Sequence, residues 1–96
     1  DNAIEATVDE LWPLLSDGER ELVARFLSGM KRAMQRHVLY RWLRNEPGLS
    51  ACRFSDVEAI RGILAPEAEC AKVNLPGGWH ARRRQGRVFL QPPGEV

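Results

Sequence analysis

The sequence lacks features that several classes of protein need. It has only two cysteines, Cys52 and Cys70, in no CxxC pair, which is too few for a disulfide framework and the wrong spacing for structural zinc. No uncharged stretch is long enough to cross a bilayer. A phosphate-cradling glycine loop is missing, as are the GxSxG and HExxH motifs. We therefore expect free thiols, no metal, no cofactor, no catalytic residue and no membrane contact.

Length and composition indicate one folded domain over residues 1–96. Ninety-six residues is close to the usual size of a single domain, and 44% hydrophobic with 28% charged residues is typical of a globular chain. Because the chain starts at Asp1 and shows no signal-peptide pattern, we expect a cytoplasmic fragment of a longer enzyme.

The charges come in blocks of alternating sign, although the net charge is only +1. Residues 1–21 hold seven acidic and one basic residue (net −6), and residues 22–44 hold six basic and no acidic residues (net +6). Residues 45–70 hold five acidic and two basic residues (net −3), and residues 71–96 hold five basic and one acidic residue (net +4). A nearly neutral total can therefore hide basic surfaces.

The spacing of apolar residues predicts a helical part over residues 4–65. Trp12 and Trp42 lie on apolar stripes of this part, and Trp79 lies on one further along, so we expect all three in the core. Pro13 should begin or end a helix. The expected helices are 4–15, 16–27 with a Ser16–Glu19 capping box, 30–44, and 55–65 with a Ser55–Glu58 capping box.

After Pro66 the apolar period changes from about 3.6 to 2, which predicts a β part over residues 71–91. Three antiparallel strands are expected, over 71–75, 79–84 and 87–91, with Gln85–Gly86 as a hairpin loop. This loop sets Arg82 opposite Phe89 and Arg84 opposite Arg87. The expected fold class is α+β: mainly α, with helices first and then a small three-stranded antiparallel sheet.

The helix over 30–44 carries five basic residues and no acidic residue, so it cannot form ion pairs between its own side chains. Two interpretations remain open. Acidic residues of the first helix, namely Glu5, Asp9 and Glu10, would offset the charge, or a phosphate backbone would do so.

The hairpin arginines point more strongly to a ligand. Arg82, Arg84 and Arg87 share one face with Phe89, and Arg84 opposite Arg87 is an unfavourable pair that a domain seldom keeps without use. Arginine matches phosphate geometry and Phe89 could stack a base, whereas the alternative is solvated charges that keep a sheet edge from aggregating. The candidate RNA-binding residues are Arg36, Arg41, Arg82, Arg84 and Arg87.

Three stretches in order resemble the region that follows the catalytic domain in bacterial tRNA(Ile)-lysidine synthases. Residues 33–44 (AMQRHVLYRWLR) resemble the family helix L-Q-R-x-x-L-R-x-W-L, with Tyr40 in place of a basic residue. Residues 54–64 (FSDVEAIRGIL) resemble S-x-x-H-V-E-x-I, with Asp56 in place of the histidine. Residues 73–90 (VNLPGGWHARRRQGRVFL) resemble a hairpin of the type L-P-G-G-x-x-x-x-R-x-x-x-x-L.

The resemblance implies a non-catalytic tRNA-binding domain of an ATP-dependent ligase, which joins lysine to the wobble cytidine of an isoleucine tRNA. ATP and magnesium would belong to the N-terminal catalytic domain, whose SGGxDS loop is absent here. The implied partners are tRNA and that catalytic domain, and the parent enzyme could be a homodimer.

Two other classes compete with this interpretation. A docking module would use its acidic and basic helices on neighbouring domains, without touching nucleic acid. A DNA-binding domain would use residues 30–44 as a recognition helix.

Overall fold

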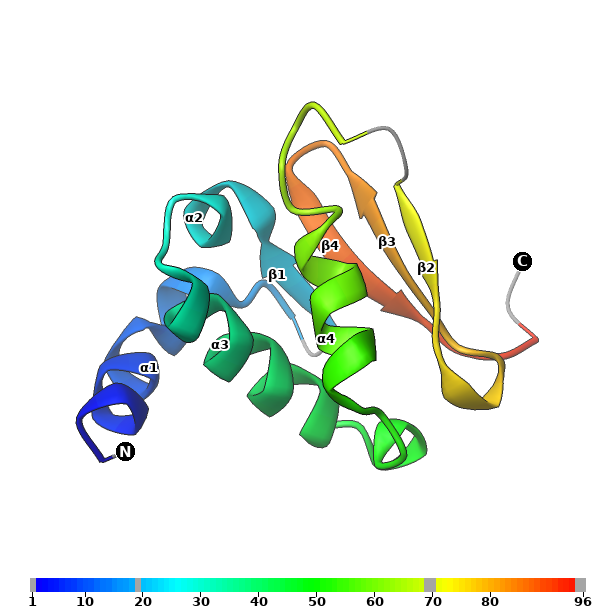
Figure 1. Ribbon diagram of the computed structural model, residues 1–96, viewed down its shortest axis with the longest axis horizontal. Coiled ribbons are helices and arrows are strands. Elements are labelled where there is room, and N and C mark those ends of the chain that lie inside the picture. The colour runs from blue at the N-terminus through cyan, green and yellow to red at the C-terminus, as the bar shows by residue number, and fades with distance from the viewer. Residues whose placement is uncertain (1, 19, 69–70, 95–96) are drawn as a thin grey trace.

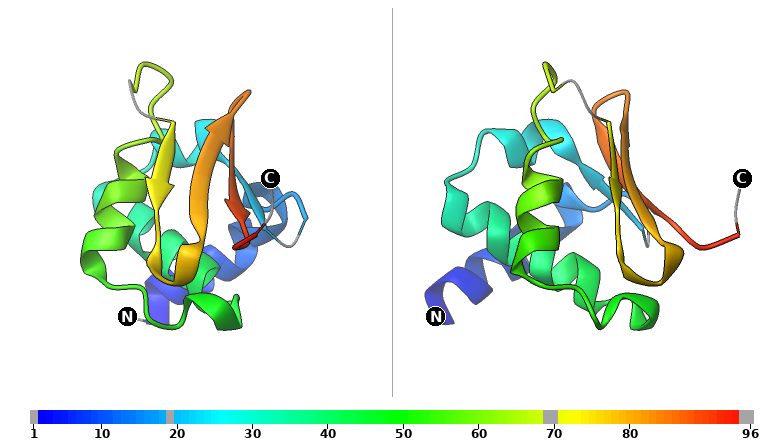
Figure 2. Two further views of the ribbon diagram at one scale, coloured as in Figure 1. Left: turned by 90° about the vertical axis from the view of Figure 1, so that its right-hand side faces the viewer. Right: turned by 45° about the vertical axis from the view of Figure 1, so that its right-hand side comes forward.

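The computed structural model describes residues 2–18, 20–68 and 71–94, and these form two layers. The helices lie on one face of a sheet, and no described helix or strand lies over its other face (Figures 1 and 2). This arrangement confirms the α+β class. The elements in chain order are α1 (Asn2–Leu15), β1 (Glu21–Val23), α2 (Ala24–Ser28), α3 (Arg32–Arg44), the 3-10 turn η1 (Pro47–Leu49), α4 (Phe54–Arg61), β2 (Lys72–Asn74), the 3-10 turn η2 (Pro76–Gly78), β3 (His80–Arg84) and β4 (Arg87–Gln91).

The predicted count of three strands is wrong, because the sheet has four antiparallel strands in the order β1-β4-β3-β2. The extra strand is β1, which we expected inside a helix over 16–27. Leu22 pairs with Val88 of β4 and is fully buried, so long-range pairing overrides the local helical spacing. Ser16 does not open a helix, since its hydroxyl donates to the Trp12 carbonyl at 2.9 Å. Glu19, the other member of the expected capping box, lies outside the described residues.

Two expected helix boundaries also differ. Pro13 neither begins nor ends α1, which continues to Leu15; Pro13 is exposed and sits in the last turn, where it removes only one hydrogen bond. The helix α4 does not use the Ser55–Glu58 box. It begins at Phe54, and the backbone N–H of Arg53 donates to Asp56 Oδ2 at 2.8 Å. Asp56 therefore caps this helix, and Glu58 is left to bind elsewhere.

The predicted hairpin register is confirmed. Arg82 pairs with Phe89, Arg83 with Val88 and Arg84 with Arg87. Gln85 and Gly86 both have positive φ, 52° and 78°, as a two-residue turn of the favoured hairpin type requires.

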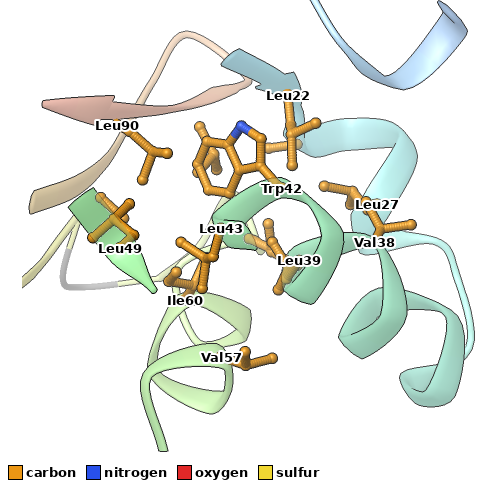
Figure 3. Packing of buried hydrophobic residues seen from close by; sticks show 14 of the residues in the cluster. Leu22, Leu27, Val38, Leu39, Trp42, Leu43, Leu49, Val57, Ile60 and Leu90 are labelled. Carbon is orange, nitrogen blue, oxygen red and sulfur yellow. The ribbon is translucent and has the colours of Figure 1, made fainter. Parts of the chain in front are cut away.

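The core lies between the two layers, with Trp42 of α3 at its centre (Figure 3). Trp42 and Trp79 are 2% and 7% exposed, which confirms their predicted burial, whereas Trp12 is only half-buried at the edge of the core. Cys52 is a free, half-buried thiol, and burial raises its pKa; Cys70 lies outside the described residues. Of the helices described, none has the length and apolar character to cross a membrane.

Candidate nucleic-acid interface

The uncovered face of the sheet, which we call the outer face, is built by strand alternation. Leu22, Ala81, Val88 and Leu90 point into the core, so the residues between them point the other way. Figure 2 shows this face toward the viewer in its left-hand picture. The outer face consists of Glu21, Val23, Lys72, Asn74, His80, Arg82, Arg84, Arg87, Phe89 and Gln91.

One row of paired residues crosses the whole outer face. Lys72 pairs with Arg82, Arg82 with Phe89, and Phe89 with Glu21. Directly paired side chains lie about 4.5 to 5.5 Å apart at Cβ, so Arg82 has a cation on one side and an aromatic ring on the other. The sequence did not single out Lys72, because nothing local fixes how its strand aligns with the hairpin.

Arg82 and Arg84 have neutral partners. Arg82 Nη1 donates to Gln91 Oε1 at 3.3 Å, and the Arg84 guanidinium carbon lies 5.4 Å from the Phe89 ring centroid. Neither arginine forms an ion pair with a carboxylate in the part of the chain that the structure describes. Both are exposed, so their charge is available to an anion.

Arg87 differs from these two because it has acidic partners. It forms an ion pair with Asp17, and its Nη1 lies 4.0 Å from Glu21 Oε1. These carboxylates offset the repulsion between Arg87 and Arg84 that the register imposes. Arg87 is therefore a weaker candidate for phosphate than Arg82 or Arg84.

Two hollows flank the ring of Phe89 on the outer face. The larger, about 430 Å³, is lined by Lys72, Arg82 and Arg84 among others. The smaller, about 290 Å³, is lined by Glu21, Gln85 and Arg87 among others. Arg84 and Phe89 line both hollows.

The other two predicted residues, Arg36 and Arg41, lie in the helical layer, away from the outer face. Arg36 binds Glu58 through two hydrogen bonds of 3.0 Å each. These bonds, together with the attraction of Arg61, lower the pKa of the Glu58 carboxyl. Arg41 forms an ion pair with Asp9 of α1, as the interpretation based on the first helix expected. Contact of Arg36 and Arg41 with RNA stays a prediction.

The helix α3 is also poorly placed to enter a DNA groove. It packs against α1 and α4 and buries one side in the core, so only a strip that includes Arg32 and Arg44 is exposed (Figure 1). These contacts argue against a recognition helix over residues 30–44.

Arg83 lies on the core side of the sheet, whereas its neighbours Arg82 and Arg84 lie on the outer face. Its Nη2 donates to the Ala68 carbonyl at 3.4 Å, and its backbone N–H donates to Ala71 O at 2.9 Å. Its guanidinium reaches past the apolar side chains to the Ala68 carbonyl, which lies in the loop that precedes β2 in the chain. Arg83 therefore holds this loop to the sheet.

A model described as the TilS substrate binding domain matches residues 22–89. This range runs from β1 into β4, and so includes most of the outer face and the helices α2 to α4. No curated protein matches the chain.

Proposed function

The chain belongs to the TilS substrate-binding domain family, and we propose that its outer face holds the tRNA on which a tRNA(Ile)-lysidine synthase acts. The chain is a substrate-binding module of that enzyme. We propose in addition that this substrate is tRNA and that the chain contacts it through the outer face.

The observation that carries the proposal is the uncompensated charge of the outer face. Arg82 and Arg84 lie on the uncovered outer face and have no described carboxylate as a partner, whereas Arg36, Arg41 and Arg87 each have at least one. A guanidinium offers a planar fork of donors that matches phosphate oxygens. Contacts of this kind position a nucleic acid without reading its sequence.

The chemical step of the proposed reaction joins lysine to the wobble cytidine of an isoleucine tRNA at the expense of ATP. In our proposal the catalytic domain of the enzyme holds ATP and magnesium. This chain acts beside that domain, in the cytoplasm. The paired glycines Gly77 and Gly78 do not fit a phosphate loop, since they turn the chain from β2 into β3 and no helix follows them. In the proposed reaction, the role of this chain is to bind and orient the tRNA.

Titration of the 96-residue chain with tRNA tests the proposal. Arg82→Gln and Arg84→Gln should each weaken binding about fivefold, the loss of one charged phosphate contact worth about 1 kcal/mol. Arg25→Gln is the matched control, because Arg25 is exposed on α2 in the helical layer. Affinity should also fall with salt, with a log–log slope of about −0.7 to −0.9 per phosphate contacted.

Two results would count against the outer face. If all three variants bind tRNA equally, the surface is elsewhere. If the chain binds no tRNA but binds the catalytic part of the enzyme, the docking-module alternative is right. Tighter binding to duplex DNA than to tRNA would favour the DNA-binding alternative.

A further inference from the structure

We infer that the outer face takes an unpaired nucleotide, with its base against Arg84 and Phe89 and its phosphate at Arg82. This inference rests on the proposed function, because it assumes that the outer face meets RNA. It adds that the RNA segment bound there is single-stranded, a loop or a chain end.

An aromatic ring on a solvated, cationic sheet face is the first reason. Phe89 lies on the outer face, paired with Arg82 on one side and Glu21 on the other, and it remains partly exposed. The Arg84 cation lies within the about 6 Å range in which an aromatic ring attracts a cation. Both aromatic rings and guanidinium planes are surfaces on which unpaired bases stack.

The hollows beside this pair are the second reason. The larger, about 430 Å³, falls within the range of about 300 to 1,000 Å³ that is usual for ligand pockets. In a duplex the bases are stacked and paired, so they cannot enter a hollow or cover a ring. A duplex would touch the arginines alone and leave Phe89 unused.

The charged residues that line the two hollows indicate how the nucleotide is oriented on the outer face. Among the residues that the structure describes, Lys72, Arg82 and Arg84 line the larger hollow and no carboxylate does. The smaller hollow is lined by Arg84 and Arg87 as well as by Glu21, but Arg87 is already paired with Asp17 and Glu21. The Glu21 carboxylate can accept a hydrogen bond from a base amino group. The phosphate therefore lies toward β2 and the base toward β1.

The test compares a short single-stranded RNA, its duplex and whole tRNA in titrations of the 96-residue chain. Phe89→Leu keeps an apolar side chain but removes the ring, so it should weaken single-strand and tRNA binding at least about fivefold and leave duplex binding unchanged. Phe26→Leu is the matched control. Phe26 is 48% exposed on α2 and also has an arginine over its ring, Arg25 at 5.5 Å, but lies in the helical layer.

A second measurement does not depend on how the variant folds. Photo-cross-linking of the wild-type chain to single-stranded RNA that carries 5-bromouridine should attach the base to the peptide containing Phe89. A tRNA without its single-stranded 3′ end and an isolated stem–loop then show which unpaired segment is bound, and either source agrees with the inference.

The outcomes separate the inference from the proposed function. Loss of tRNA binding in Arg82→Gln but not in Phe89→Leu, or cross-links only outside the β4 peptide, would overturn the inference and leave tRNA binding in place. Wild-type binding to duplex as tight as to single strand would also overturn it. Failure of the wild-type chain to bind any RNA would remove the proposed function and the inference with it.

Discussion

Replacing Gly48 by alanine should destabilise the domain, because there is no room for a Cβ atom at this position. A Cβ on Gly48 would lie 2.8 Å from Trp79 Nε1 and 2.9 Å from Trp79 Cζ2. Gly48 does not have a positive φ, so the cost is steric and not conformational. Trp79 is only 7% exposed, and its ring cannot move away without disturbing the core.

The expected size follows from these contacts. Overpacking of a well-packed site costs about 1 to 3 kcal/mol, and the restriction of the unfolded chain by alanine returns about 0.4 to 1 kcal/mol. The difference of these ranges is centred on a net loss of about 1.3 kcal/mol and reaches about 2.6 kcal/mol. For a domain of this size each kcal/mol lowers Tm by about 4 to 8 °C.

Urea denaturation and thermal melting of three further variants, Gly29→Ala, Trp79→Phe and the double variant Gly48→Ala/Trp79→Phe, complete the experiment. Gly29→Ala is the control, since the nearest atom to its Cβ would be the Phe26 carbonyl oxygen at 4.0 Å, and its stability should be unchanged or slightly higher. In the double variant Gly48→Ala/Trp79→Phe the smaller ring makes room for the Cβ atom. The double variant should therefore lose less stability than the two single variants lose together. An unchanged Tm for Gly48→Ala, or losses that add within about 0.5 kcal/mol, would refute the steric argument.

Three further predictions concern stability. Trp42→Ala should lower the free energy of unfolding by about 3 to 5 kcal/mol, because this side chain is 2% exposed at the centre of the core; a loss of a few tenths in urea denaturation would contradict that position. Arg83→Ala should cost about 1 kcal/mol through its bond to the Ala68 carbonyl and leave tRNA affinity unchanged, so a loss of affinity at constant Tm would be the opposite result. Hydrogen bonds from Arg36 lower the pKa of Glu58, so the ionised carboxyl stabilises the fold at neutral pH and this contribution disappears as the pH falls below the ordinary carboxyl value. Glu58→Gln should therefore show a smaller change of urea midpoint between neutral and acidic pH than the wild type, and equal changes would argue against this pair.

Features that depend on neighbours in the chain could be predicted from the sequence. The apolar stripe of residues 30–44 indicated a helix, and the structure has α3 at Arg32–Arg44. The Gln85–Gly86 loop fixed the register of the whole hairpin, because a two-residue loop leaves one way to pair the strands. Alternation along that hairpin then placed Arg82, Arg84 and Arg87 on one face.

Features that depend on distant contacts could not be predicted. The short strand β1 exists because β4 offers it a partner far along the chain, and its apolar spacing also suits a helix. The alignment that brings Lys72 beside Arg82 has the same origin. The sequence offered Asp9 only as one of three acidic residues that could offset the basic helix, and nothing in it indicated that Glu58 pairs with Arg36, because this carboxylate comes from another element.

The alternating charge blocks help explain why the sheet is the better candidate surface and the basic helix is not. Asp9 of the first block pairs with Arg41 of the second, and Glu58 of the third pairs with Arg36, so the helical layer uses part of its charge internally. In the last block, with five basic residues and one acidic residue, Arg87 pairs with Asp17 and lies 4.0 Å from Glu21, whereas Arg82 and Arg84 form no ion pair with a described carboxylate. The charges of Arg82 and Arg84 lie on strands whose opposite face packs into the core. A surface of this kind attracts anions at long range through its excess charge, and it holds them through guanidinium groups that need not break an ion pair first. Adding a carboxylate there, as in Gln91→Glu beside Arg82, should therefore weaken tRNA binding more than removing the positive charge of Arg87, and the reverse order would show that compensation by neighbouring acids does not decide which arginines bind.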